Sequence, residues 1–200
     1  IRFWPGQYIT LGNPASSYSI ANTPNSDGDI ILFVTKIENG ITSNYIHQDL
    51  KVGDTINING PYGTFIGDPK VELPVLCIAN GSGLAPIMSL ATAALMRGGF
   101  KYPAHIIFSA RTEKDIFDIG HFKFLEKKFR NFQFIPTLTR EKNDSFKHGR
   151  VTEILSHLYP NLDYYSLFIA GSNQFVSDVK ELCLKLGAKE ENIHLEKFMN

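Results

Sequence analysis

The sequence has little cysteine. Its 200 residues include two, Cys77 in an apolar strand pattern and Cys183 in an apolar helix pattern. Two thiols in such places do not make a disulfide framework, and they are too few for an iron–sulfur cluster held by four cysteines. We therefore expect buried free thiols and a reducing, cytoplasmic location.

The chain also lacks an excess of charge and a long apolar run. Twenty Lys and Arg residues balance twenty Asp and Glu residues, so no basic field is present to attract nucleic acid. The longest run free of charge and of strongly polar groups, Leu84 to Met96, is too short to span a bilayer. The six histidines show no metal-ligand spacing. We expect no nucleic acid, no membrane and no metal among the binding partners.

The stretch from Val75 to Ile87 carries the strongest local signal. An apolar run of strand length is followed by a small-residue turn, Asn80 to Gly83, and then by an apolar pattern of helical period that Pro86 opens. Such a turn exposes backbone N–H groups at the positive end of a helix, where a phosphate can approach. The turn is neither a Walker loop nor a nucleophile elbow, and it departs from the G-x-G-x-x-G fingerprint because proline stands at the third glycine position.

The hydrophobic period changes along the chain and predicts two domains. Residues 1–68 alternate apolar and polar residues in short segments, which predicts an antiparallel β-barrel that lacks its first strands. We also expect that the chain is an excerpt of a longer one or is trimmed at the front. After a connector of Gly67 to Pro74, residues 69–200 alternate strands with helices, which predicts a doubly wound parallel sheet. The expected strands are Gln7–Leu11, Ser17–Ala21, Ile30–Ile37, Thr55–Asn59, Val75–Ala79, His105–Ser109, Phe132–Pro136, Leu167–Ala170 and Ile193–Leu195.

A series of short motifs follows the order seen in the ferredoxin–NADP reductase superfamily, and the chain resembles that family over nearly its whole length. The closest likeness is to the reductase components of bacterial oxygenases and of deoxysugar-forming systems. The motifs are Pro5-Gly6-Gln7-Tyr8, Tyr18-Ser19-Ile20-Ala21, Gly40-x-x-Ser43, Gly60-Pro61-Tyr62-Gly63-x-Phe65, Gly81-Ser82-Gly83-Leu84-Ala85-Pro86, Ser109-Ala110-Arg111 with Asp115 and Phe117, Ala170-Gly171-Ser172, and Glu196-Lys197-Phe198.

The resemblance implies that the first domain binds FAD. Tyr18 would pack against the isoalloxazine, the Ser19 hydroxyl would lie near flavin N5, and Ile20 would lie beside them. Small residues and N–H groups from Gly40 to Ser43 would meet the flavin phosphates.

The resemblance also implies that the second domain binds NADH or NADPH. Gly81, Ser82 and Gly83 would hold the dinucleotide pyrophosphate, and Gly171 would lie at the neighbouring strand end. Glu196 would stabilise positive charge that develops on the nicotinamide, and Phe198 would cover a ring face. Arg111 would contact the adenosine side, and Arg140 with Lys142 or Lys147 would grip a 2′-phosphate if the donor is NADPH.

Two residues depart from the family pattern. The flavin motif Arg-x-Tyr-Ser has Ser16 in place of its arginine, and a serine hydroxyl cannot replace the charge that arginine offers to a phosphate. Ala170 stands where many relatives have cysteine near the nicotinamide. This second change should tune hydride transfer without abolishing it, because the thiol does no covalent chemistry.

The resemblance predicts an enzyme, an FAD-dependent NAD(P)H reductase that passes electrons to an iron–sulfur protein or to a ferredoxin domain absent from this chain. The lack of a Ser/His/Asp or paired-carboxylate arrangement agrees with this, because the cofactors supply the chemistry of hydride transfer. Two alternatives stay open. The chain would be a free-flavin reductase if flavin came and went as a substrate, or a non-catalytic domain if it had lost tight flavin binding.

Overall fold

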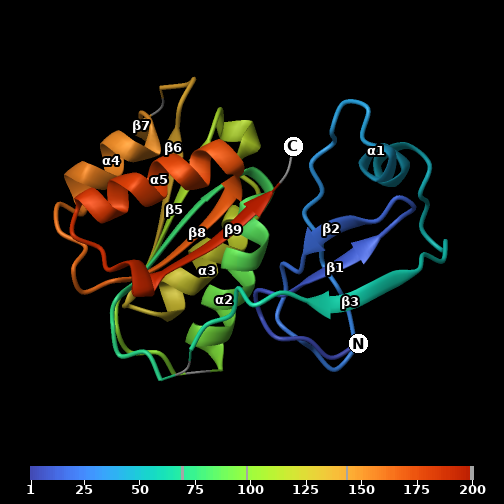
Figure 1. The fold of residues 1–200 in the computed structure, drawn as a ribbon, viewed down its shortest axis with the longest axis horizontal. Coiled ribbons are helices and arrows are strands. Elements are labelled where there is room, and N and C mark those ends of the chain that lie inside the picture. The colour runs from blue at the N-terminus through green and yellow to red at the C-terminus, as the bar shows by residue number, and fades with distance from the viewer. Residues whose placement is uncertain (69, 98, 143, 199–200) are drawn as a thin grey trace.

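A computed structural model of the chain describes residues 1–68, 70–97, 99–142 and 144–198, and it shows two lobes side by side (Figure 1). The larger lobe is built on a six-stranded sheet with the strand order β7-β6-β5-β4-β8-β9, and all of its pairings are parallel. Its strands are β4 (Val75–Asn80), β5 (Ala104–Ala110), β6 (Phe132–Leu138), β7 (Lys147–His148), β8 (Ser166–Ser172) and β9 (Ile193–Phe198). The predicted doubly wound parallel sheet is confirmed.

Helices cover both faces of this sheet. Along β4, Leu76 and Ile78 pack on one face while Cys77 and Ala79 pack on the other, as a strand buried on both sides requires. The first face is covered by α4 (Val151–Leu158) and α5 (Asn173–Lys185), and the second by α2 (Leu84–Met96) and α3 (Ile119–Lys128). Short 3₁₀ helices lie at Gly81–Gly83, Glu113–Asp115 and Glu190–Asn192.

The smaller lobe is an antiparallel sheet of three strands with the order β2-β1-β3. Its elements are β1 (Tyr8–Leu11), β2 (Ser16–Ser19), the helix α1 (Ile41–Gln48) and β3 (Ile58–Tyr62). The antiparallel character is confirmed, although the three described strands do not close into a barrel. The predicted strand at Thr55–Asn59 lies three residues later in the chain than expected, and α1 was not predicted.

The predicted strand at Ile30–Ile37 is wrong. Ile30 and Leu32 do pack against the core of the small lobe while Ile31 is exposed, so the alternation has a physical cause. Within this segment, however, Leu32 forms only a single bridge, to Ile20. The loop is held on both sides of Ile31, whose N–H donates to Asn22 Oδ1 at 2.7 Å and whose carbonyl accepts the Ala21 N–H at 2.8 Å.

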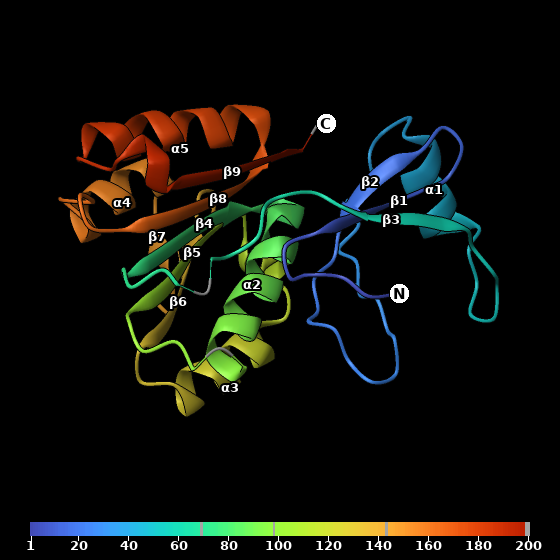
Figure 2. The same cartoon turned by 60° about the horizontal axis from the view of Figure 1, so that its bottom comes forward.

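The two lobes share one hydrophobic cluster. Ala21 and Phe65 of the small lobe are buried in the same cluster as Leu84 of α2. Two aromatic pairs cross between the lobes: Phe33 meets Phe117 at 4.7 Å between ring centroids, and Phe65 meets Phe168 at 5.5 Å. Helix α2 lies on the side of the large lobe that faces the small one (Figure 2). Pro69, in the predicted connector, lies outside the described residues.

The free edge of β6 is protected against pairing with another strand. In the first part of β6, the backbone nitrogens of Phe132, Phe134 and Pro136 point away from β5. The Phe132 N–H donates to the Phe129 carbonyl, the Phe134 N–H donates to Glu126 Oε1 at 2.9 Å, and Pro136 has no N–H. A strand edge without free donors is a poor template for another chain.

Glu126→Ala is expected to lower the free energy of unfolding by about 1 kcal/mol, because the Phe134 N–H loses its acceptor. Urea denaturation followed by circular dichroism measures this change. Glu126→Gln is the matched control, because its amide oxygen can still accept the bond. This variant should lose less than half as much stability as Glu126→Ala. Equal losses in both variants would show that the bond to Phe134 is not the cause.

Candidate active site

The turn after β4 brings the first predicted binding residues to the carboxyl edge of the large sheet. Gly81 has a φ of +52°, and a Cβ there would meet no atom within 4 Å, so the turn faces open space. A Cβ on Gly83 would collide with the Ala170 carbonyl and lie 2.8 Å from the Gly171 nitrogen. Glycine is therefore required for the turn to lie directly on β8, and the structure brings the predicted residues Gly83 and Gly171 together. Ser82, between the two glycines, is half-buried.

Asn80 fixes this turn and was not predicted as a site residue. Its Oδ1 accepts the Ser172 N–H at 3.1 Å, and its Nδ2 donates to Ser172 Oγ at 3.5 Å. The side chain thus ties the end of β4 to the end of β8. The two residues are 92 positions apart, so local sequence patterns give no sign of the contact.

The two predicted catalytic residues meet across the lobes. Ser19 Oγ, at the end of β2, donates a hydrogen bond of 2.5 Å to Glu196 Oε1 on β9. Ser19 is buried, and burial raises the pKa of Glu196 to about 7, although the bond from Ser19 lowers it somewhat. A carboxyl group with such a pKa can hold or release a proton near neutral pH. This contact joins residues that lie 177 positions apart in the chain.

The residues predicted to bind flavin gather between β2 and the start of α1. Burial raises the pKa of Tyr18, while a hydrogen bond with the Ser16 side chain lowers it. Ser16 Oγ in turn donates to Thr42 Oγ1 at 3.2 Å, in the first turn of α1. The departure from the family motif at Ser16 therefore lies beside the helix N-terminus.

The side chains of Ser43 and Ile20, two other predicted residues of this lobe, are occupied by hydrogen bonds and by core packing, respectively. Ser43 Oγ accepts the Ile37 N–H at 3.1 Å and donates to the Gly40 carbonyl at 3.3 Å. The Ile20 side chain is fully buried in the core of the small lobe. The backbone N–H groups of Gly40 and Ile20 are also in use, since they donate to the carbonyls of Ile37 at 3.0 Å and of Gln7 at 2.9 Å.

The donors at the starts of α1 and α2 fit the phosphates of FAD and of a nicotinamide dinucleotide. Gly40 is the N-cap of α1, and Asn80 is the N-cap of the 3₁₀ helix Gly81–Gly83 that runs directly into α2. None of these helices has a side-chain cap bond or an acidic residue in its first turn. The first N–H groups of a helix have no acceptor within the helix, and its positive end favours an anion. Before α2, Gly81 leaves space for a phosphate to approach the backbone closely.

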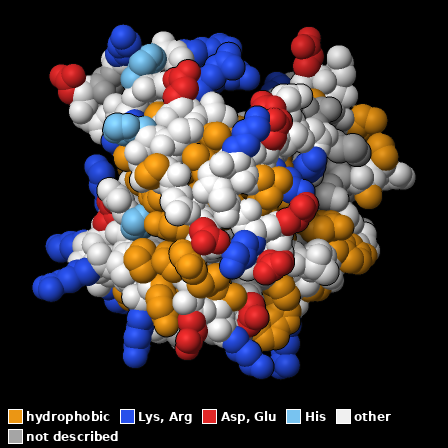
Figure 3. Space-filling view, turned by 60° about the vertical axis from the view of Figure 1, so that its left-hand side comes forward, with side chains coloured by type: hydrophobic (Ala, Val, Ile, Leu, Met, Phe, Trp, Pro, Cys, Tyr) orange, Lys and Arg blue, Asp and Glu red, His pale blue; other side chains and the backbone are white. Residues whose placement is uncertain are grey.

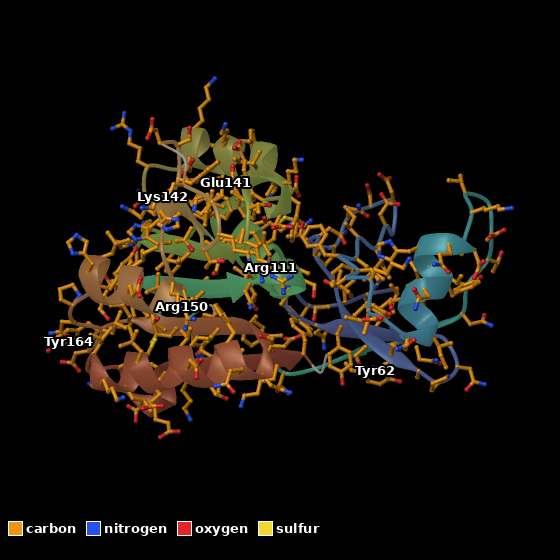
Figure 4. The ribbon with its side chains drawn as sticks, turned by 90° about the horizontal axis from the view of Figure 1, so that it is seen from above. Tyr62, Arg111, Glu141, Lys142, Arg150 and Tyr164 are labelled. Carbon is orange, nitrogen blue, oxygen red and sulfur yellow. The ribbon has the colours of Figure 1, made fainter. Side chains whose placement is uncertain are left out.

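Arg111 and Arg140 lie on adjacent loops at the same edge of the large sheet. Both are exposed, and the Arg140 N–H donates to the Arg111 carbonyl at 2.9 Å. Figure 4 shows Arg111 at the end of β5 that faces the small lobe, and Lys142 and Glu141 farther from that lobe. Lys147 lies on β7, where it lines an open hollow of about 350 Å³ that contains none of the predicted binding residues except itself.

The C-terminal strand β9 carries the remaining predicted residue. Phe198 is half-buried at the end of β9 and pairs with Ser172, so it lies at the same edge as Gly171.

On the side of the molecule seen in Figure 3, acidic and basic side chains are intermixed and no field of one sign forms. No described helix could cross a membrane, and the described residues contain no group of three His, Cys, Asp or Glu placed to hold a metal ion.

Comparison with known proteins agrees with this arrangement. The chain matches the oxidoreductase FAD-binding domain over residues 1–66 and the oxidoreductase NAD-binding domain over residues 77–181. It is 32% identical to ferredoxin–NADP reductase B of Sorangium cellulosum, over 98% of this chain and 85% of that protein. It is 31% identical to the ferredoxin–NAD(P)⁺ reductase component of the naphthalene 1,2-dioxygenase/salicylate 5-hydroxylase systems of a Ralstonia species, over 99% of this chain and 61% of that protein.

A crystal structure of a cytochrome P450 reductase from Amycolatopsis has the same fold, with a TM-score of 0.91 and 26% identity. The match covers 100% of this chain and 62% of that one, so the chain spans about three fifths of the length of several proteins that it resembles. The matches to both domain families, together with the likeness to the Sorangium reductase, place the chain in the ferredoxin–NADP reductase superfamily.

Proposed function

We propose that this chain is the flavin- and nucleotide-binding part of an NAD(P)H reductase, with residues 1–68 binding FAD and residues 69–200 binding NADH or NADPH. When bound, FAD would accept a hydride from the nicotinamide and release the electrons singly to a partner. The observation that carries the proposal is the bond between Ser19 and Glu196, because it joins the strand proposed to hold flavin to the strand end proposed to hold nicotinamide.

The chain's own residues bind, orient and exclude water in this proposal. Gly81, Ser82 and Gly83 hold the dinucleotide pyrophosphate at the start of α2, with Gly171 beside them. Tyr18 and Phe198 cover ring faces, and backbone groups of Ile20 and of Gly40 to Ser43 approach the flavin. Arg111 contacts the adenosine side, and Arg140 is the candidate for a 2′-phosphate.

Ser19 and Glu196 have the electrostatic role. The Glu196 carboxyl, when ionised, would stabilise positive charge that develops on the nicotinamide. Since its pKa is about 7, part of the population carries the charge at neutral pH and part is protonated. The Ser19 hydroxyl donates to Glu196 Oε1 at 2.5 Å. Together, Ser19 and Glu196 would set the charge and the protonation state of the site where the lobes meet.

We propose an iron–sulfur protein, or a ferredoxin domain outside this sequence, as the electron acceptor. The Ralstonia relative is a ferredoxin–NAD(P)⁺ reductase component, which supports a partner of this kind.

The two cysteines, Cys77 and Cys183, are free, buried and in separate hydrophobic clusters. These reduced thiols also support a cytoplasmic location.

Ser16 favours a second candidate, a free-flavin reductase. Its hydroxyl donates to Thr42 and brings no positive charge to the start of α1, so the flavin phosphate would be held by helix N–H groups without the usual arginine. A flavin held in this way would dissociate readily and could turn over as a substrate.

Mixing the protein anaerobically with excess FAD and with NADH or NADPH is expected to bleach the flavin absorbance near its visible maximum. Stopped-flow spectroscopy with each nucleotide separately identifies the donor. Rapid turnover of added FMN or riboflavin without retained FAD would select the free-flavin reductase. Nucleotide binding by calorimetry without flavin binding or bleaching would instead mean a non-catalytic domain and would reject the proposed reduction.

Ser16→Arg is expected to tighten FAD binding by about tenfold or more, because a guanidinium at this position would reach the phosphates at the start of α1. Fluorescence titration of FAD measures the dissociation constant. Ser17→Arg is the control, since it adds the same charge one residue along β2, where the side chain points to the other face. If both variants tighten binding equally, general charge and not the position beside α1 is responsible.

Glu196→Gln is expected to remove a pH dependence of stability. The folded-state pKa of about 7 lies above the usual carboxyl value, so the native protein holds a proton that the unfolded chain has lost between about pH 4.5 and 7. The free energy of unfolding of the wild type should therefore fall as the pH rises through this window, by about 3 kcal/mol at most. Denaturation at several pH values measures the slope, which the glutamine variant should lose. A wild-type stability that rises over the window would contradict the assignment.

A further inference from the structure

A buried hydroxyl on α2 reaches across to the small lobe. Ser89 is fully buried in the middle of α2, and its Oγ donates a hydrogen bond of 2.8 Å to the backbone carbonyl of Asn22. A buried serine on a helix usually bonds within its own helix. Here the acceptor lies 67 positions away in the chain, on the loop that leaves β2.

Asn22 is built to hold that carbonyl in place. Its Oδ1 accepts the Ile31 N–H at 2.7 Å, and its Nδ2 donates to the carbonyls of Thr23 and Asp29, each at 3.0 Å. The backbone next to it is also tied down, because the Ala21 N–H donates to the Ile31 carbonyl at 2.8 Å. The acceptor of the Ser89 bond is therefore a fixed point of the small lobe.

The bond connects the two elements that the proposed reaction must align. Asn22 lies three residues beyond Ser19, and Ser89 lies on the helix that begins directly after Gly83. Nearer the end of the same helix, Arg97 Nη2 donates to the Pro24 carbonyl and fixes the same loop a second time. Both contacts join α2 to the chain segment that continues from Tyr18 and Ser19.

Apolar packing alone would not set this alignment. The pairs Phe33 with Phe117 and Phe65 with Phe168 hold the lobes together, but hydrophobic contact has no direction and permits small displacements. A hydrogen bond restricts both distance and angle. Hydride transfer is sensitive to the relative position of the two lobes, since a displacement of about 1 Å at the reacting atoms can lower the rate about 100-fold.

We propose that Ser89 is a positioning residue, whose bond to Asn22 sets the small lobe's flavin-contact strand against the dinucleotide-binding turn. The inference rests on the proposed reductase function and goes beyond it in assigning a residue that touches neither cofactor. Without the hydroxyl, the Asn22 carbonyl would be left without its buried donor and the lobes would sample a wider range of positions.

The test compares Ser89→Ala with Thr137→Val. Thr137 is also fully buried and its hydroxyl also donates to a backbone carbonyl, that of Phe108 at 3.4 Å, but within one lobe. The first measurement needs no cofactor. Nitroxide labels at Asn59→Cys on β3 and Lys127→Cys on α3 report the distance between the lobes by double electron–electron resonance. We expect a broader distance distribution for Ser89→Ala and an unchanged one for Thr137→Val.

The second measurement is stopped-flow reduction at saturating FAD. We expect the rate constant of hydride transfer to fall about tenfold or more in Ser89→Ala while the dissociation constants of FAD and nucleotide change less than about twofold. The control should keep the wild-type rate. Asn22→Ala keeps the backbone carbonyl but removes the side-chain bonds that hold it in place, so in a double-mutant cycle its effect and that of Ser89→Ala should not be additive.

An unchanged distance distribution in Ser89→Ala overturns the inference, and so does an unchanged rate constant in a protein whose wild type reduces flavin. If the wild type reduces no flavin but Ser89→Ala still broadens the distance distribution, the proposed function is wrong. The positioning role of the bond between Ser89 and Asn22 is then still supported. If Ser89→Ala does not fold, Ser89→Cys, which keeps nearly the same volume with a much weaker donor, takes its place with the same expected direction.

Discussion

The structure depends on one constraint, that the end of β2 in the small lobe must meet the end of β9 in the large lobe. The Ser19 hydroxyl and the Glu196 carboxyl satisfy it with a single short bond. β9 is the edge strand of the sheet and Glu196 pairs with Ala170 of β8, so the position of the carboxyl is set by the sheet register. The same β8 also supports the Gly81 to Gly83 turn, because Gly83 lies against Ala170. One strand thus positions both the turn and the carboxyl.

A carboxyl group at this position is costly to bury. Loss of water around Glu196 disfavours the charged form and raises its pKa to about 7, and one hydroxyl donor offsets only part of that effect. Apolar or neutral side chains would make the contact between the lobes more stable. A buried group that titrates near neutral pH is instead typical of sites where charge changes during a reaction. The raised pKa therefore agrees with the proposed role of Glu196 in balancing charge beside the nicotinamide.

The sequence predicted the elements whose signals are local. The strand, turn and helix from Val75 onward follow from apolar runs, two glycines and a proline in consecutive positions, and the structure reproduces them. The segment Ile30–Ile37 failed because alternation reports burial, while a strand also needs a neighbour to pair with, and that neighbour is set by the rest of the fold. Asn80 with Ser172 and Ser89 with Asn22 were out of reach for a related reason, since each bond joins residues distant in sequence. Ser19 and Glu196 were predicted only through the family resemblance.

The small lobe also explains why stability and alignment cannot be separated in this protein. A sheet of three short strands has little apolar surface to bury by itself and needs packing against another element. Here Ala21 and Phe65 find that packing in the cluster built around α2. The helix that completes the core of the small lobe is therefore the helix that begins at the turn proposed to bind the dinucleotide. Because the buried hydroxyl of Ser89 lies within this same contact, the packing that keeps the small lobe folded also fixes where β2, the strand proposed to contact flavin, lies.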